Sequence, residues 1–497
     1  MAIHDTTRRR LGPRAVLLAL GLALPWAAAC GESAPNCPTL DAGSDDGGGV
    51  EGEGGADADA DGGADAAADA DSEVAAAVCG NGALEPGEEC DLTAFGGATC
   101  ASLGRTPGTL ACADDCRYDT AGCAACGDGR CEAGETPLTC AAECAVVDVS
   151  AATVHTCAVL ADGSVRCWGA HAGHQLGGVG DVLRPVRVPG IDDATKVAAG
   201  EGHTCVLHED GTVSCWGRSG FGECRSVAAR VWPPAVVTEL AGVTALAAGA
   251  HHTCAVLGDG TASCWGRSDF GNLGNGTHPA RAAMPQAVTG LGGVTTIAAG
   301  AQHTCVAASG GVSCWGRNDV GQVGGNDRNW HDLPERPVTG GARAFGVGSY
   351  HGCACIMMPA WPPSAQGLYC WGNNAYGQLG VAPSPDALAP THIAIGCPAA
   401  LEGGDTFTCS LPAAPGSVLC WGGNSFGQLG DGTQLSRYTT AEVLDVADAV
   451  QLSAGASHIC ARLLDGTLRC WGRNVEGQVG GGTSARHLPY PVEPVGL

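Results

Sequence analysis

Six histidines recur at one position of a repeated phrase, and they are the side chains with the clearest potential for chemistry. They are His155, His203, His252, His303, His351 and His458. Neutral imidazoles gathered in a ring would suit a transition metal. One histidine per repeat, usually followed by threonine, is instead typical of a structural hydrogen bond that is repeated by symmetry. We therefore expect a structural role, with no metal and no cofactor.

The spacing of possible nucleophiles identifies no catalytic site. Ser219 follows Gly217, but it lacks the second spaced glycine and the following helix of a nucleophile elbow. Lys196 is the only lysine between residues 146 and 497, so the glycine-rich turns are not phosphate loops. No pair of acids recurs in a way that indicates glycoside cleavage. The expectation is a protein that is not an enzyme.

The phrase Cys-Trp-Gly sets the organisation of the chain. It occurs seven times, beginning at Cys167, Cys215, Cys264, Cys314, Cys370, Cys420 and Cys470. A repeat of about fifty residues is in the range of propeller blades. Each copy has a short apolar strand, a two-strand hairpin, a turn of the Gly-Gln-Leu-Gly type and a proline-containing strand, and four strands make a blade. The sequence predicts an all-β, seven-bladed β-propeller over 146–497, with the tryptophans packed between blades. A carbohydrate-stacking ring of tryptophans is the alternative.

The hairpin register predicts a disulfide in every blade. A three-residue loop, Ala161–Gly163, places Cys157 directly opposite Cys167, where the Cβ atoms are close enough for a bridge. The loop is shorter in the fourth copy and longer in the sixth, yet the two cysteines still face each other. The predicted pairs are Cys157–Cys167, Cys205–Cys215, Cys254–Cys264, Cys305–Cys314, Cys353–Cys370, Cys409–Cys420 and Cys460–Cys470.

The phrases Ala-Ala-Gly, His-Thr, Asp-Gly, Trp-Gly and Gly-Gln-Leu-Gly together resemble the repeats of the regulator of chromosome condensation family, over 146–497. The resemblance implies a seven-bladed propeller in which the repeated histidine is structural. The cysteine pair in each blade departs from that family, as does the export signal described next. Guanine nucleotide exchange, which the family name suggests, is a less favoured function because export would separate the protein from a GTPase.

The N-terminus reads as a secretory signal peptide over 1–29. Arg8, Arg9, Arg10 and Arg14 precede an apolar run and three alanines, Ala27–Ala29. Cys30 resembles the lipidated cysteine of bacterial lipoproteins, although Ala27 stands where that motif usually has leucine, so simple cleavage after Ala29 is the alternative. The expected location is the outer membrane or cell surface as a lipoprotein, or otherwise secretion. The lipid would be the only contact with a membrane.

Two further regions precede the propeller. Residues 30–78 form a linker in which 41–75 holds twelve acids and no basic residue, so we expect a disordered stalk. Residues 79–145 hold ten cysteines and predict a small disulfide-stapled module that resembles the cysteine-rich repeats of myxobacterial surface proteins. Four cysteines are left over: Cys37, Cys224, Cys355 and Cys397, of which the last two could pair.

The favoured function is a binding module for a protein or glycan partner. The loops at 176–190, 222–237, 325–337, 356–367 and 381–391 vary on a constant framework. The blade-five insertion is the foremost candidate contact, with Met357, Met358 and Trp361. A net charge of −26 and the lack of a basic cluster within 146–497 argue against nucleic acid.

The alternative function is an exported enzyme that degrades carbohydrate or peptide from the propeller loop face. Carboxylates and histidines clustered at one end of the channel would favour it. The loop acids are scattered along the sequence, which favours binding; they are Asp181, Asp327, Asp332, Glu335 and Asp386.

Overall fold

The structure is a computed structural model. It describes residues 88–100, 110–113, 116–119, 135–178, 183–357, 366–413 and 417–497, together with residues 84, 102, 130 and 131. All of them belong to one unit, Ala75–Leu497. The predicted signal peptide and linker, with Cys30, Cys37, Met358, Trp361 and Asp181, lie outside the described residues. No helix of the described part is long and apolar enough to cross a membrane.

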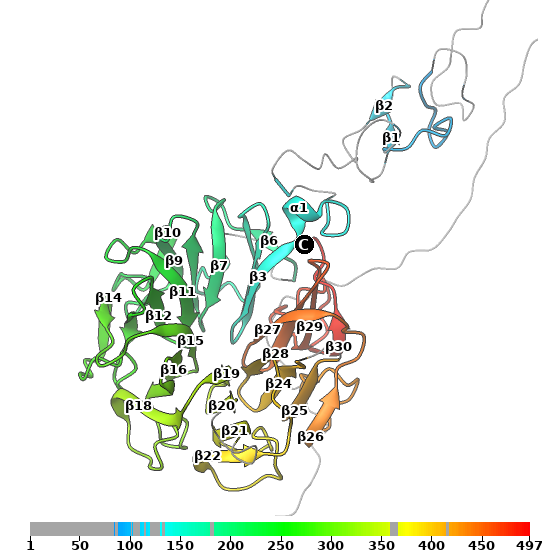
Figure 1. Cartoon of the computed structure of the whole chain (residues 1–497). Helices are drawn as coiled ribbons and strands as arrows, with labels where there is room; N and C mark the ends of the chain where they lie inside the picture. The colour runs from blue at the N-terminus through cyan, green and yellow to red at the C-terminus, as the bar shows by residue number, and fades with distance from the viewer. Residues whose placement is uncertain are drawn as a thin grey trace, which may run out of the picture. The chain divides into compact units, whose positions relative to one another are not determined.

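Seven four-stranded antiparallel sheets form a ring of blades, so the predicted propeller is confirmed (Figure 1). Each blade uses four consecutive strands, in chain order from the channel outward. The strands are β3 (Val146–Ala151), β4 (His155–Leu160), β5 (Val165–Gly169) and β6 (Val186–Arg187); β7 (Ala194–Ala199), β8 (His203–His208), β9 (Val213–Arg218) and β10 (Arg230–Val236); β11 (Val243–Ala248), β12 (His252–Leu257), β13 (Ala262–Arg267) and β14 (Arg281–Ala287); β15 (Val294–Ala299), β16 (His303–Ala308), β17 (Gly311–Gly316) and β18 (His331–Thr339); β19 (Ala342–Val347), β20 (His351–Ile356), β21 (Gly367–Gly372) and β22 (Ala387–Ile393); β23 (Ala400–Gly403), β24 (Phe407–Leu411), β25 (Leu419–Gly422) and β26 (Arg437–Glu442); and β27 (Ala449–Ala454), β28 (His458–Leu463), β29 (Leu468–Arg473) and β30 (His487–Val492).

Position in the blade explains the composition of each strand. The two middle strands lie between neighbouring blades, so both of their faces are buried: all six residues of β4 are buried, and so are five of the six in β12. A strand buried on both faces reads as a continuous apolar run rather than an alternation. The outermost strands face solvent, and β26 is almost wholly exposed. The variable, polar part of each repeat is therefore its outer edge.

The hairpin register is as predicted, and the structure joins all seven predicted cysteine pairs. Cys157 lies opposite Cys167, and Gly163 in the turn has a φ of +77°. All seven bridges span a Cα–Cα distance of 4.1 Å. Cys355 on β20 is bridged to Cys397, which lies in the connection between blades five and six. Cys224 is the one free cysteine among the described residues, and burial raises the pKa of its thiol.

The ring closes without exchanging strands between its first and last blades. Thr156 Oγ1 lies 2.8 Å from His458 Nε2, and Trp168 Nε1 donates to the Gln478 carbonyl at 2.9 Å. The amide of Val146 donates to the Gly466 carbonyl at 2.9 Å. The same tryptophan-to-carbonyl hydrogen bond joins each of the other six pairs of neighbouring blades. Closure therefore uses the ordinary contact between blades.

The cysteine-rich region has two described parts. In the first, β1 (Ala111–Cys112) pairs with β2 (Tyr118–Asp119), and Cys90 is bridged to Cys112. The second part includes α1 (Ala141–Cys144) and the Cys131–Cys144 bridge.

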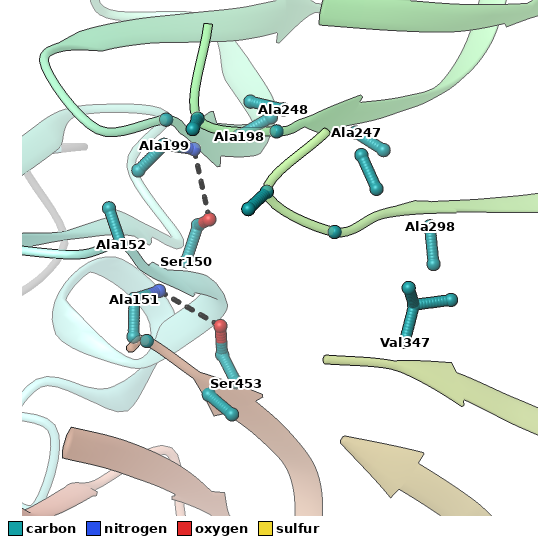
Figure 2. Close-up of a pocket in the computed structure, with 18 of the residues that line it drawn as sticks. Ser150, Ala151, Ala152, Ala198, Ala199, Ala247, Ala248, Ala298, Val347 and Ser453 are labelled. Atoms are coloured by element: carbon teal, nitrogen blue, oxygen red, sulfur yellow. Dashed lines mark hydrogen bonds between the residues drawn. The ribbon is translucent and has the colours of Figure 1, made fainter. Parts of the chain in front are cut away.

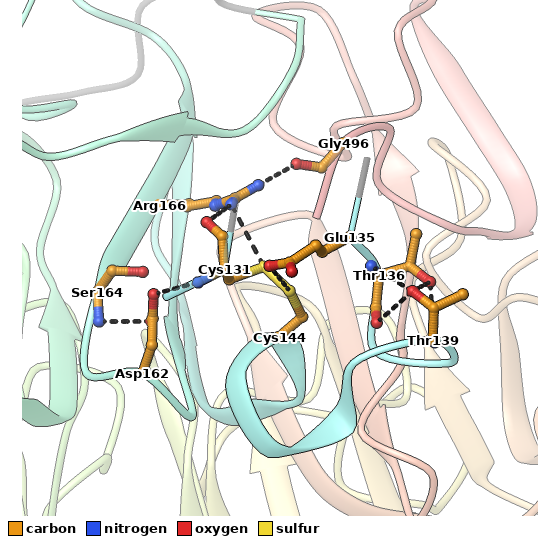
Figure 3. The surroundings of a disulfide bond; sticks show 9 residues. All are labelled: Cys131, Glu135, Thr136, Thr139, Cys144, Asp162, Ser164, Arg166 and Gly496. Atoms are coloured by element: carbon orange, nitrogen blue, oxygen red, sulfur yellow. Dashed lines mark hydrogen bonds between the residues drawn. A yellow bond between two sulfur atoms is a disulfide. The ribbon is translucent and has the colours of Figure 1, made fainter. Parts of the chain in front are cut away.

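The second part packs against the first and last blades (Figure 3). Arg166 on β5 donates to the carbonyls of Cys131 at 3.0 Å and Gly496 at 2.5 Å. Asp162 accepts from the Cys131 amide at 2.8 Å. The segment before β3 therefore braces the seam between blades one and seven.

Candidate interaction face at the channel mouth

The repeated histidines join each blade to the next. His Nε2 lies 2.8–3.0 Å from a threonine Oγ1 of the following blade in five pairs, which are His155–Thr204, His203–Thr253, His252–Thr304, His351–Thr408 and His458–Thr156. Thr156, Thr204 and Thr408 also donate to a main-chain carbonyl of the preceding blade's glycine-rich turn. Such a hydroxyl has already given its proton, so it accepts from Nε2–H, and the tautomer of its histidine is fixed.

Burial keeps the whole ring of histidines uncharged. The pKa falls from 6.5 to about 3 for His155, His203, His252, His303 and His458, and to about 4 for His351, because the charged form would lose its hydration. Nε2 is committed to the next blade in five of the six residues. The ring is therefore a structural device, as the sequence suggested.

Two junctions between blades depart from this arrangement. In blade six Phe407 stands in place of the histidine, and in blade seven Ile459 stands in place of the threonine. Both side chains belong to one buried apolar cluster, so an apolar contact replaces the histidine–threonine hydrogen bond. In blade five, Gly352 takes the threonine position, and His303 Nε2 has no hydrogen-bond partner. A Cβ at residue 352 would lie 2.8 Å from the Trp371 ring, so a larger residue there would require this ring to move.

The tryptophans of Cys-Trp-Gly pack between blades, as predicted. Each indole Nε1 donates over 2.7–3.0 Å to a carbonyl in the preceding blade's glycine-rich turn; the pairs are Trp168–Gln478, Trp216–Gln175, Trp265–Glu223, Trp315–Asn272, Trp371–Gln322, Trp421–Gln378 and Trp471–Gln428. All seven side chains are at most 1% exposed. Because they are covered, these rings cannot stack on a sugar.

The inner strands enclose a channel lined mainly by small side chains, with a cavity of about 210 Å³ (Figure 2). Ser150 Oγ accepts from the Ala199 amide at 3.0 Å, and Ser453 Oγ accepts from the Ala151 amide at 2.9 Å. Glu402 occupies the matching position on β23. Burial raises the pKa of Glu402 to about 8, although a hydrogen bond from the Ala454 amide opposes the shift.

Acids and a histidine gather at one end of this channel, the end at which the Trp-Gly strands finish. We call this end the channel mouth. Glu201 Oε2 lies 3.4 Å from His251 Nε2, and His251 Nδ1 lies 3.8 Å from Oε1 of the buried Glu223. Asp405 is held by Ser349 and also lines this end. Burial raises the pKa of Glu223 and Asp405 and lowers that of His251, which Glu201 partly opposes.

The expectation that acids would be scattered was therefore incomplete. Three of the predicted loop acids instead pair with basic side chains of the outer loops and strands. Asp327 lies 3.0 Å from His331, Asp386 lies 2.9 Å from Arg328, and Asp332 lies 3.6 Å from His278. The cluster at the mouth uses framework positions instead. It was missed because its members come from different blades and share no spacing.

A cluster of arginines and aromatic rings lies at the same end of blades three and four. Phe270 meets Trp330 edge to face, with ring centroids 4.7 Å apart. Arg267 and Arg317 lie over Phe270 at 5.3 and 5.4 Å, and each also pairs with an acid two residues along the chain. Trp330 remains 56% exposed. We call Arg267, Phe270, Arg317 and Trp330 the Arg–aromatic patch.

The end of the β20–β21 hairpin that carries the blade-five insertion is the one away from the mouth. In the β20–β21 hairpin, His351 pairs with Gly372 at the mouth end, and Ile356 pairs with Gly367 beside the insertion. Met357 is exposed there, whereas Met358 and Trp361 lie outside the described residues. The predicted binding loops are thus divided between two faces.

Comparisons with known proteins agree with the fold. The "Regulator of chromosome condensation (RCC1) repeat" profiles match residues 162–207, 194–223, 243–272, 259–307, 294–322, 415–462 and 449–478. A search of curated proteins found no match.

Similar solved structures include yeast RCC1 (Prp20) bound to Kap60, with 20% identity over 69% of this chain and 85% of that chain, and a TM-score of 0.59. Prp20p from Saccharomyces cerevisiae, in a structure whose description names binding to Gsp1p and histones, has 19% identity over 70% and 87%, with a TM-score of 0.58. Human WBSCR16 has 20% identity over 63% and 84%, with a TM-score of 0.56. Identities this low show a shared fold.

Proposed function

We propose that this seven-bladed propeller, parts of which match the regulator of chromosome condensation repeat, is an exported interaction protein whose channel-mouth face binds a protein partner. The Arg–aromatic patch is the observation that carries this proposal. Tryptophan and arginine are the residue types that contribute most to binding at protein interfaces. Here they are held in a fixed arrangement, so little conformational freedom is lost on binding.

The framework around the patch supports the same proposal. The glycine-rich turns, the repeated histidines and the tryptophans rigidly connect the blades, while the segment that carries Trp330 belongs to a variable loop. Tyr350 and Tyr376 are also exposed at this end. Propeller relatives are described with Kap60, Gsp1p and histones as partners, which illustrates that the fold serves protein binding. Their low identity carries none of those partners to this chain, and a glycan remains the alternative ligand.

Carboxylates and a histidine do gather at the mouth, which is the arrangement that would favour an enzyme, but we propose that they have no role in covalent catalysis. His251 is flanked by Glu201 and Glu223 and packs on Phe221, with no hydroxyl or thiol hydrogen-bonded to it among the described residues. A base without a nucleophile does not make a covalent catalyst. The half-exposed Glu201 and the buried Glu223 flank the imidazole, which lies between blades two and three.

Export and surface anchoring complete the proposal. A disulfide buried in every blade fits an oxidising compartment, and the basic and apolar N-terminal segment fits a secretory signal. We expect Cys30 to carry the lipid. Fractionation of cells that express the wild type or Cys30→Ala tests this: the wild type should stay with membranes, and the variant should be released. Equal release of both would contradict anchoring.

The binding proposal is tested by photo-crosslinking on intact cells. A photoreactive phenylalanine analogue is placed at Trp330 or, as a matched control, at Leu464. Leu464 is 75% exposed and lies in the β28–β29 turn, away from the mouth. We expect a protease-sensitive adduct from position 330 and none from 464, and the variant Arg317→Ala should weaken it. Equal crosslinking at both positions would refute a specific mouth face, and a protease-resistant adduct would indicate a glycan.

A further inference from the structure

A second cavity, of about 390 Å³, lies between blades one and two, beside the β8–β9 turn. That turn is at the end of the blade away from the mouth, since His203 pairs with Gly217 at the mouth end. Apolar groups form much of its wall, including Pro189, Ile191, Pro233 and Val236. Asp193, His208 and Ser214 also line it.

These three polar side chains form one hydrogen-bonded chain. Ser214 Oγ lies 2.8 Å from His208 Nε2, and His208 Nδ1 lies 2.6 Å from Asp193 Oδ1. His208 ends β8, Ser214 lies on β9, and the pairing of Ala194 with His208 brings Asp193 to the imidazole. The order is hydroxyl, imidazole and carboxylate. The search for catalytic motifs in the sequence did not identify this group of side chains.

The direction of the hydrogen bonds follows from the chemistry of the groups. An ionised carboxylate can only accept, so His208 Nδ1 carries the proton that faces Asp193. The lone pair of Nε2 then accepts from the Ser214 hydroxyl. This is the tautomer in which an imidazole acts as a general base toward a serine. Ser214 is buried, and the histidine side chain is 11% exposed toward the cavity.

The rest of the ring shows that a blade does not require this arrangement. Ser263 occupies the position of Ser214 in blade three, and there Leu257 stands in place of His208. Val243 pairs with Leu257 as Ala194 pairs with His208, so Gly242 takes the place of Asp193. That blade folds with the same register and the same disulfide. The polar chain in blade two is therefore an addition to the framework.

We infer that Ser214 is an activated nucleophile for acyl transfer from small, uncharged carboxylic esters. Ser214 Oγ would form a bond to the ester carbonyl carbon while its proton passes to His208 Nε2. Asp193 stabilises the imidazolium. The bond from the carbonyl carbon to the alcohol oxygen then breaks, and His208 returns the proton to the leaving alcohol. Water releases the acid from Ser214 by the same proton route, so ester and water give acid and alcohol.

The cavity defines the substrate class. Its volume admits a short acyl chain, and its proline, isoleucine and valine side chains favour an apolar one. This site is separate from the mouth face, so it goes beyond the proposed binding function, and Trp330 variants should not affect it.

A fluorophosphonate probe tests the nucleophile on the full mature chain. Serine attack forms an Oγ–P bond and releases fluoride while His208 takes the proton. We expect labelling of the wild type at Ser214, shown by peptide mass, and none in Ser214→Ala. His208→Leu, which copies blade three, should label about 100-fold more slowly. The matched control Ser263→Ala should label like the wild type.

Hydrolysis of p-nitrophenyl butyrate provides the second readout. The wild type and Ser263→Ala should turn over the ester, whereas Ser214→Ala and His208→Leu should not exceed the uncatalysed rate. Asp193→Gly should retain part of the activity, because the imidazole remains but loses its orientation. Circular dichroism spectra verify that each variant is folded. Unlabelled folded wild type, a label on another residue, or labelling without ester turnover would each overturn the inference.

Discussion

Acidification should unfold the propeller in the pH range where free histidine becomes charged. Six histidines are wholly buried and uncharged, with pKa values of about 3 to 4 in the folded state against 6.5 when exposed. Between those values the unfolded chain binds protons that the folded chain cannot. Stability is therefore present above pH 6.5 and is lost as the pH falls toward the folded pKa.

The size of the effect follows from the number of histidines. Each loses about 1.4 kcal/mol per pH unit below 6.5, so each contributes about 2 kcal/mol of destabilisation at pH 5. Six of them sum to about 12 kcal/mol. Glu402, whose pKa is raised to about 8, opposes this because the folded state binds its proton first, and Glu223 and Asp405, whose pKa values burial also raises, act in the same direction. The Glu402 side chain is only half-buried, so its offset is at most about 3 kcal/mol. The remainder, about 9 kcal/mol, is comparable to the whole stability of a typical domain.

Guanidinium unfolding followed by tryptophan fluorescence measures this, since the seven buried indoles report on blade packing. The unfolding midpoint should hardly change between pH 7.5 and 6.5. It should then fall steeply, with the free energy of unfolding decreasing by roughly 6 kcal/mol per pH unit near pH 5.5 once the opposing effect of Glu402 is included. A midpoint at pH 5.5 equal to that at pH 7.5 would refute the reasoning, because it would mean that the histidines are accessible to protons in the folded state.

Three further predictions concern single features of the ring. His155→Phe should lower the free energy of unfolding by about 1–3 kcal/mol, because Thr204 loses its buried donor. Adding Thr204→Val to His155→Phe should recover most of the lost stability, as the native Phe407–Ile459 pair suggests. If the two single-variant costs simply add in a double-mutant cycle at pH 7.5, the two side chains are not coupled and this prediction is wrong. Replacing Cys254 and Cys264 with alanine should cost about 2–3 kcal/mol by the chain-entropy argument. The melting temperature measures this loss, and an unchanged value after complete reduction of the protein would count against it. Replacing 357–366 with Asp-Gly should leave the circular dichroism spectrum unchanged, because the loop length already varies at this turn. The affinity of that deletion variant for the crosslinked partner then decides whether the insertion takes part in binding.

The repeat and its local register were predictable from spacing alone. In an antiparallel hairpin the loop length fixes which residues face each other, so Ala161–Gly163 sufficed to place Cys157 opposite Cys167. The same argument held where the loop was shorter, at Cys305 and Cys314. The number of blades followed from counting Cys-Trp-Gly. These features depend on residues near one another in the chain.

Contacts between blades could not be predicted in this way. Glu201 and His251 meet at the mouth although they belong to different repeats, and Phe270 meets Trp330 across blades three and four. Nothing in the spacing of such residues indicates the contact, because it exists only when neighbouring sheets pack face to face.

The Ser214 site combines both cases. The β8–β9 hairpin alone places His208 near Ser214, six residues away, and this pair was within reach of a register argument. Asp193 lies in the connection that follows blade one, and the same connection contributes Pro189 and Ile191 to the apolar wall of the cavity. The sequence determined the blade and its seven copies, since those follow from hydrogen-bond register within a hairpin. Only the tertiary structure decided which side chains share a cavity or a face, because that depends on how the twisted sheets stack around the channel.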